Sequence, residues 1–170
     1  MFEAHIKRIL HNRIIKKEVS HRKLFSGIAS EAILVIIEDD DIENLTGLTR
    51  LYEKLPLNRD QIDVVCCNDA SGLLQHVDVH SVSSKDIGLT GKVKSEMLER
   101  LLEKPYQFVI TYFNGESLLG PLLTAKTNAQ FKIGKTPDVF GIFDIEIRCE
   151  TPHVFEQEII KYFKILKNNN

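Results

Sequence analysis

A strand–helix–strand unit within residues 106–134 constrains the fold of this chain more than any other stretch. Residues 106–113 form an apolar run rich in side chains that favour β-structure, and leucines then recur at helical spacing from Leu118 to Leu123. Residues 129–134 alternate polar and apolar side chains, which is the period of a second strand. Because a helix lies between them, the two strands are expected to be parallel neighbours in one sheet, joined by a right-handed crossover.

The rest of the chain repeats this alternation, so the sequence predicts a single three-layer α/β domain of Rossmann or flavodoxin type with a mostly parallel sheet. Further strands are expected at 31–38, at 61–67 and around 77–82, and further helices at 42–55, 92–104 and 152–166. In the helix of the opening unit, Gly120-Pro121 removes a backbone donor, so a kink or split is expected there. Residues 135–142 are too few for a crossover helix, so the strand at 143–149 is expected to be antiparallel to its predecessor or displaced across the sheet.

Composition places the chain among ordinary globular proteins. At 170 residues it is long enough for one domain with a sizeable core, and 27% charged residues with a net charge of −2 give no global attraction to nucleic acid or membranes. Three cysteines cannot pair completely, which fits a reducing compartment, and no apolar run is long enough for a membrane span. A cytoplasmic protein is therefore expected.

The N-terminal residues carry the strongest bias in composition. Residues 1–23 hold seven Lys or Arg and two Glu residues, so their charge is +5 and that of the remainder is −7. Residues 1–22 are expected to form a basic amphipathic helix ahead of a domain at 23–167 and a frayed tail at 168–170. Its apolar face is expected to comprise Phe2, Ile6, Ile9, Leu10 and Ile14, and its candidate contacts to a polyanion or partner are Lys7, Arg8, Arg13, Lys16 and Lys17.

Two interpretations of this helix remain open. In the first, which we favour, the helix packs on the domain with its cations in water, and any partner uses only its outer face. In the second, it is a basic arm that binds RNA or the ribosome.

A second group of candidates follows the expected strands. In parallel sheets, ligands bind beyond the carboxyl ends of the strands. That edge is predicted to carry Asp39, Asp40, Asn68, Asp69, Ser84, Lys85 and Asn114. Clustered carboxylates with a lysine are able to hold Mg²⁺ and a phosphoryl group, but helix caps and turns account for the same residue types and are the favoured interpretation.

Other motifs do not reach the requirements of a known chemistry. His76, Asp78 and His80 alternate on one side of an expected strand, yet no further ligand cluster accompanies them, so we expect no bound transition metal. The glycines at 88 and 91 before Lys92 have two residues between them where a phosphate-binding P-loop has four. We therefore assign no catalytic residue and no cofactor.

Three segments carry a resemblance: Ser84-Lys85-Asp86-Ile87, the stretch from Gly91 to Glu96, and Ala129–Gly134. With them the chain resembles a family of small uncharacterised bacterial α/β proteins, over about residues 84–166 and more weakly over the first helix and strand. Leu89 and Gln107 depart from the aromatic residue and the aspartate usual there. The unit ending at Ala129–Gly134 is also similar to the N-terminal half of heptosyltransferase-type glycosyltransferases, which implies a fold and not an activity.

The sequence thus predicts a non-catalytic binding or adaptor protein whose most plausible partner is another protein. An RNA- or ribosome-associated factor that uses the basic helix is the first alternative. A small enzyme, or a remnant of a glycosyltransferase, with a site at the strand ends is the second.

Overall fold

The computed structural model describes residues 1–22, 25, 30–38, 46–67, 79–113 and 117–169. Its centre is a six-stranded sheet in the order β3-β2-β1-β4-β5-β6, and every neighbouring pair is parallel. The strands are β1 (Ile33–Glu38), β2 (Ile62–Cys66), β3 (Val79–Ser81), β4 (Tyr106–Phe113), β5 (Ala129–Lys135) and β6 (Ile145–Ile147). This is the strand order of the Rossmann fold, so the predicted fold class is confirmed.

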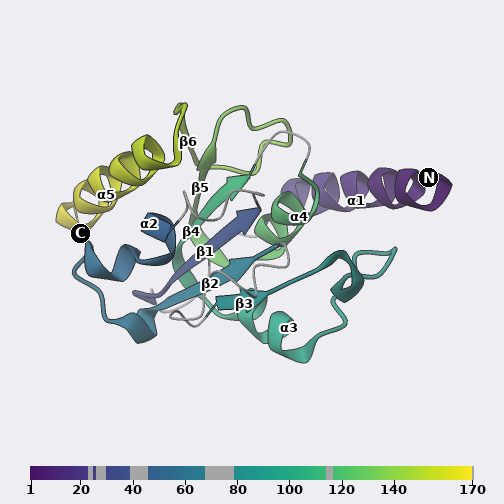
Figure 1. Cartoon of the computed structure of the whole chain (residues 1–170), viewed down its shortest axis with the longest axis horizontal. Helices are drawn as coiled ribbons and strands as arrows, with labels where there is room; N and C mark the ends of the chain where they lie inside the picture. Colours follow the sequence, from purple (N-terminus) through teal and green to yellow (C-terminus); the bar gives the residue numbers. More distant parts are fainter. Residues whose placement is uncertain (23–24, 26–29, 39–45, 68–78, 114–116, 170) are drawn as a thin grey trace.

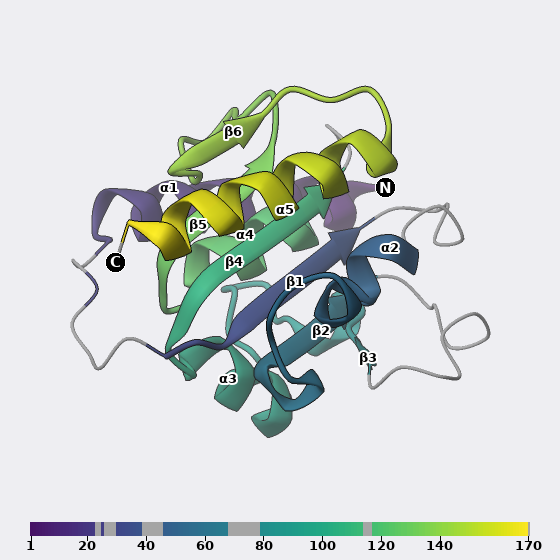
Figure 2. The ribbon, with the colours of Figure 1, turned by 90° about the vertical axis from the view of Figure 1, so that its left-hand side faces the viewer.

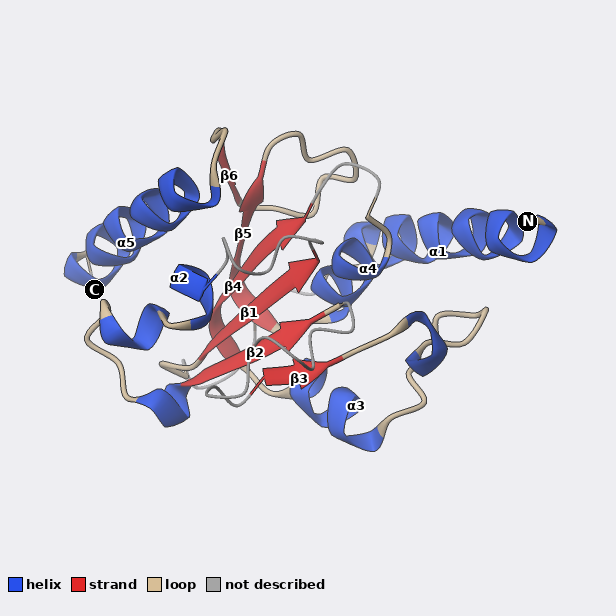
Figure 3. Cartoon of the chain, viewed as in Figure 1, coloured by secondary structure: helices blue, strands red, loops and turns tan. Residues whose placement is uncertain are grey.

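The opening unit has the predicted arrangement. β4 and β5 are parallel, with Tyr106 beside Ala129 and Thr111 beside Gly134. The arrowheads of the central strands point to the same edge of the sheet in Figure 3. Two crossovers of opposite direction leave β1 and β4 adjacent, so the point where the strand order reverses lies between these two strands.

Helices cover both faces of the sheet. They are α1 (Phe2–Ser20), α2 (Thr46–Thr49), α3 (Glu96–Glu103), α4 (Leu119–Lys126) and α5 (Pro152–Asn168). In Figures 1 and 2, α2 and α5 lie on one side of the sheet, and α1, α3 and α4 lie on the other. The predicted three layers follow from this arrangement.

Near-continuous hydrophobicity in β1 reflects its two covered faces. Ile33, Val35 and Ile37 pack in the core under α2 and α5, whereas Leu34 and Ile36 pack in the core under α1, α3 and α4. All five side chains are essentially inaccessible to solvent. Fully burying each contributes about 1.5–3 kcal/mol, so this strand gives apolar support to both layers.

Two helix predictions need correction. α4 begins at Leu119, so Pro121 falls in its first turn, where a backbone N–H has no partner within the helix, and the helix continues through it without a split. Of the helix expected at 42–55, the described residues 46–55 form α2 and a separate 3-10 turn at Leu51–Glu53, and residues 42–45 lie outside the described part of the chain.

The prediction for the last strand was wrong, since β6 is parallel to β5 and adjacent to it. Ile145 pairs with Ile133 and Ile147 with Lys135, so β6 pairs only with the last residues of β5. The chain between the two strands therefore runs back along only a few residues of β5. Asp138 organises this connection: its carboxylate accepts hydrogen bonds from the backbone N–H groups of Phe140 (3.3 Å) and Phe143 (2.7 Å). A crossover helix is therefore unnecessary.

The same connection explains why residue 134 is a glycine. A Cβ atom added to Gly134 would lie 2.1 Å from Cζ of Phe143 and within 2.4 Å of two other ring carbons. Gly134→Ala is therefore expected to lower the free energy of unfolding by about 1–3 kcal/mol, measured by urea denaturation. Gly88→Ala is the matched control, because there the nearest atom to an added Cβ is 3.5 Å away.

If overlap with the ring is the cause, Phe143→Ala should relieve part of the cost of Gly134→Ala in the double variant. Additive effects of the two substitutions would contradict this explanation.

Candidate functional site

Most of the residues predicted at the strand ends cannot be placed relative to one another, because Asp39, Asp40, Asn68, Asp69 and Asn114 lie outside the described residues. Ser84 and Lys85 lie in a 3-10 turn, Ser84–Asp86, that follows β3. Of the proposed histidine pair, His76 is outside the described residues and His80 is half-buried on β3.

The turn that contains Ser84 and Lys85 belongs to a structured loop, residues 83–94. Ser83 caps the turn, since its hydroxyl accepts a hydrogen bond from the N–H of Lys85 (3.3 Å) and its own N–H donates to Asp86 Oδ2 (2.7 Å). Gly91 has a φ of +73°, and Ile87 and Val93 form an antiparallel bridge across the loop. The glycines that suggested a phosphate loop therefore shape a turn.

α1 lies against this loop, so the structure brings together the basic helix and the segment that holds Ser84. Lys7 Nζ donates to the carbonyl of Ser84 (2.5 Å), and His11 Nε2 lies 3.2 Å from the carbonyl oxygen of Gly88. A Cβ atom on Gly91 would lie only 2.7 Å from Ile14 Cδ1, so the helix approaches the loop closely. We call α1 together with residues 83–94 the basic surface.

The orientation of α1 differs from the prediction. His11 and Ile15 are its two buried side chains, whereas Phe2, Ile6 and Ile9 are 80%, 38% and 41% exposed. Ile14 and Leu10, which were also assigned to the buried face, are half-buried. In Figure 1 the N-terminal half of α1 extends past α4, and this half contacts the loop 83–94 through the opposite side of the helix, which carries Lys7 and His11.

Phe2, Ile6 and Ile9 therefore point away from the domain, at positions i, i+4 and i+7 of one helix face. Arg13, Lys16 and Lys17 are exposed and continue this face toward the C-terminal end of the helix. We call these six residues the outward face of α1. Apolar and cationic side chains thus share a single exposed stripe.

The cations of the basic surface are largely unpaired. Those that form no ion pair with a carboxylate of the described residues are Lys7, Arg8, Arg13, Lys16, Lys17, Lys85, Lys92 and Lys94. Near the C-terminal end of α1 the cations are paired. Arg22 forms a two-pronged ion pair with Asp144 (2.8 and 2.9 Å), and Lys126 of α4 lies 3.6 Å from Glu18 of α1. Apart from Lys7, which is half-buried against the loop, these unpaired cations are exposed, which leaves their charge available to an anionic partner.

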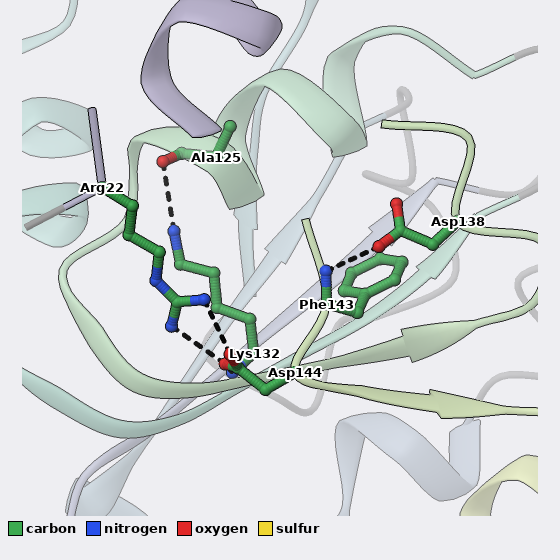
Figure 4. A network of polar contacts seen from close by, with 6 residues as sticks. All are labelled: Arg22, Ala125, Lys132, Asp138, Phe143 and Asp144. Atoms are coloured by element: carbon green, nitrogen blue, oxygen red, sulfur yellow. Dashed lines mark hydrogen bonds and ion pairs between the residues drawn. The ribbon is translucent and has the colours of Figure 1, made fainter. Parts of the chain in front are cut away.

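Beneath the end of α1 lies a buried lysine that sequence reasoning missed. Lys132 of β5 is 3% exposed, and its Nζ donates to the carbonyl of Ala125 at the end of α4 (3.1 Å). Figure 4 shows this contact beside the Arg22–Asp144 pair, and Asp144 Oδ2 also accepts from the backbone N–H of Lys132 (2.7 Å). Burial, reinforced by the charge of Arg22, lowers the pKa of Lys132 to about 8.

Other polar groups in the described part of the chain have structural roles. Asp63 accepts hydrogen bonds from Lys104 Nζ (2.7 Å) and the Tyr106 hydroxyl (2.9 Å), which ties α3 to the sheet. Burial raises the pKa of the Cys66 thiol to about 11 and that of Cys67 well above its ordinary value, so neither is an activated nucleophile. No cluster of three or more metal-ligating side chains occurs among the described residues.

Fold and surface together define a Rossmann-type α/β protein with a basic helix anchored to its side. A family of unknown function, DUF6913, matches residues 5–166. The chain belongs to this family. No curated protein and no solved structure matches it. Within the described residues, no helix is both long enough and apolar enough to cross a bilayer.

Proposed function

We propose that this protein is a non-catalytic adaptor that presents α1 as a ligand helix to an apolar, acid-rimmed groove of a protein partner. The observation that carries the proposal is the outward face of α1. Its apolar side chains Phe2, Ile6 and Ile9 are exposed while the opposite face is held on the domain by His11 and Ile15. A helix held in this way is preorganised, so binding costs less conformational entropy than folding a free peptide.

The spacing of the apolar residues favours a groove over a flat surface. Anchors at i, i+4 and i+7 are the pattern by which a helix binds the groove of a partner protein, and Phe2, Ile6 and Ile9 follow it. Aromatic and large aliphatic side chains of this kind supply most of the binding energy in such complexes.

The cations that continue the outward face favour a partner with carboxylates at the rim of its groove. Arg13, Lys16 and Lys17 have no ion pair with described carboxylates, so a partner would not have to displace an internal one. Charges at a rim chiefly raise the rate of association and select the partner, and their effect weakens with salt.

A photo-crosslinking experiment tests this proposal. The full chain carries a photoreactive phenylalanine analogue at the exposed His5, next to the outward face, and is irradiated in whole-cell lysate that retains its RNA and lipid. A protein identified in this way is then purified, and its affinity is measured for three forms of the chain. The Phe2→Ala, Ile6→Ala, Ile9→Ala triple variant is expected to bind at least about 100-fold more weakly, since each anchor contributes at least about 1 kcal/mol. Replacing Arg13, Lys16 and Lys17 by Gln is expected to flatten the salt dependence of binding.

A matched variant of α5 serves as the control. Lys161→Gln, Lys164→Gln and Ile165→Ala change exposed residues of the same types and should leave affinity unchanged. Unchanged binding of the triple alanine variant, or cross-links that form only to RNA or lipid, would overturn the proposal.

An RNA-binding role is the second candidate, and one observation favours it. The unpaired cations come from two segments far apart in sequence, α1 and the loop 83–94, which meet through Lys7 and Ser84. Such a surface is suited to phosphate contacts, but the exposed apolar residues of α1 have no part in them. Salt-dependent binding to total RNA that survives the triple alanine substitution would favour this alternative.

We further propose a cytoplasmic location, which the three free cysteines support. Bacterial origin and a distant relation to the N-terminal half of heptosyltransferase-type glycosyltransferases also remain proposals. The parallel sheet in Rossmann order supports the latter as a relation of fold, without an activity.

A further inference from the structure

The contact between α1 and the domain depends on an ionisable side chain at its centre. His11 is 3% exposed and contacts the loop 83–94. The same helix also packs against α4. The Nε2 atom of His11 lies 3.2 Å from the carbonyl oxygen of Gly88, so the neutral ring carries its proton on Nε2 and donates it there. Ile15 is the other buried side chain of α1, and Ile14 and Val19 pack partly buried against the same core, so the imidazole is one of two fully buried anchors of the helix.

Protonation would add an N–H on Nδ1 and a positive charge to a side chain that is only 3% exposed. No described atom accepts a hydrogen bond from Nδ1. A charge on a side chain this deeply buried disfavours the docked state of the helix.

The surrounding charges do not compensate for a positive imidazole. Charged side chains on the side of α1 that carries His11 are Lys7, Arg8 and Glu18. The neighbouring elements add Lys126 of α4 and Lys85, Asp86, Lys92 and Lys94 of the loop. Lys7 and Lys126 act on the ring as like charges, while the two carboxylates have partners already: Glu18 pairs with Lys126, and Asp86 accepts from the backbone of Ser83. The cluster is therefore arranged around a neutral ring.

We propose that His11 is an acid-sensitive latch: the neutral imidazole holds α1 against the loop 83–94, and its protonation releases the helix. Release of the helix at low pH agrees with the titration of the His11 side chain. Burial, together with Lys7 and Lys126, lowers the pKa of His11 below its ordinary value of 6.5. The released state binds the proton more tightly, so docking is favoured above pH 6.5 and weakens as the pH falls from 6.5 toward the lower pKa of the docked state. This inference is independent of the partner that α1 binds.

Hydrogen exchange of the full chain tests the latch. Protection of the amides of α1 is measured between pH 7.5 and 5.0, after correction for the intrinsic effect of pH on exchange, with α5 as the internal reference. In the wild-type protein, protection of residues 10–19 is expected to fall relative to α5 by up to about tenfold for each pH unit by which the pKa of docked His11 lies below 6.5.

Two variants identify the group responsible. His11→Gln keeps a donor for the Gly88 carbonyl but does not titrate, so its α1 should remain protected at pH 5.0. His5→Gln removes an exposed imidazole from the same helix and should behave like the wild type. Protection of α1 that does not depend on pH in the wild type, or that is lost equally in His11→Gln, would overturn the proposal.

A measurement on the wild-type protein alone covers the case in which His11→Gln does not fold. The imidazole resonances of His11 are followed by NMR, and their titration midpoint is expected below pH 6.5, coinciding with the loss of α1 protection. A midpoint at or above 6.5 would refute the latch, because docking would then favour the protonated ring.

Discussion

Replacing Lys132 by methionine is expected to raise the free energy of unfolding at pH 7 by up to about 3 kcal/mol. The pKa of this lysine falls from 10.5 to about 8 on folding, chiefly because burial removes water from its ammonium group. That difference corresponds to roughly 3 kcal/mol by which the folded protein disfavours the charged form. Methionine has a similar length and no charge, and replacing a buried charge by an apolar side chain is often stabilising by 1–4 kcal/mol. The lost hydrogen bond to the Ala125 carbonyl opposes this gain in part.

The pH dependence of the stability gain distinguishes removal of the buried charge from improved packing by methionine. Between pH 8 and 10.5 the unfolded chain binds more protons at Lys132 than the folded one does, so this residue makes wild-type stability rise with pH across that window. Cys66 acts in the opposite sense, since burial raises its pKa and stability falls above pH 9. Both proteins contain the cysteine, so the advantage of Lys132→Met over the wild type should shrink from pH 8 to 10.5.

Urea denaturation at several pH values, with Lys164→Met as an exposed control on α5, measures this effect. An advantage of Lys132→Met that stays constant across the alkaline window, or a variant less stable than the wild type at pH 7, would contradict the interpretation of Lys132 as a strained buried cation.

Those parts of the fold that rest on local periodicity could be predicted from the sequence. The run at 106–113 matches β4 residue for residue, and the parallel pairing of β4 with β5 followed from the helix between them. Thr151 caps α5 as the Thr-Pro pair indicates, since its hydroxyl accepts a hydrogen bond from the N–H of Val154 (3.3 Å). In these cases the signal lies within one element and its neighbours.

Features that depend on contacts between distant segments could not be predicted. The parallel β6 depends on Asp138, whose carboxylate binds backbone groups of its own loop, and no periodicity reports such a contact. Lys132 alternates with apolar residues as a solvent-facing side chain would, yet both faces of β5 are covered. A polar residue at period 2 is therefore ambiguous in a parallel sheet.

The candidate surface shows the same limit. The cations of residues 1–17 were identifiable from composition alone, whereas the partnership of α1 with the loop 83–94 rests on Lys7 and His11 meeting carbonyls 77 residues away. Five of the seven predicted strand-end residues lie outside the described part of the chain, so that site stays a prediction.

Two isoleucines of α1 provide the last prediction, because the structure reverses what their spacing indicates. Ile15 has no exposed surface and belongs to the core cluster under α1, α3 and α4, whereas Ile6 is 38% exposed. Ile15→Ala is expected to cost about 2–5 kcal/mol in the free energy of unfolding, from the lost burial and from the cavity left behind. Ile6→Ala changes the same atoms at an exposed position and should alter stability by no more than about 0.5 kcal/mol.

Urea denaturation of both variants, with hydrogen exchange of α1 as a second measurement, distinguishes the two orientations of the helix. Ile15→Ala should also speed exchange along α1, because the docked helix has only one other buried side chain, His11. Equal losses of stability in the two variants would mean that both faces of the helix are buried in solution. The outward face of α1 would then be unavailable to a partner, and the proposed adaptor role would fail with it.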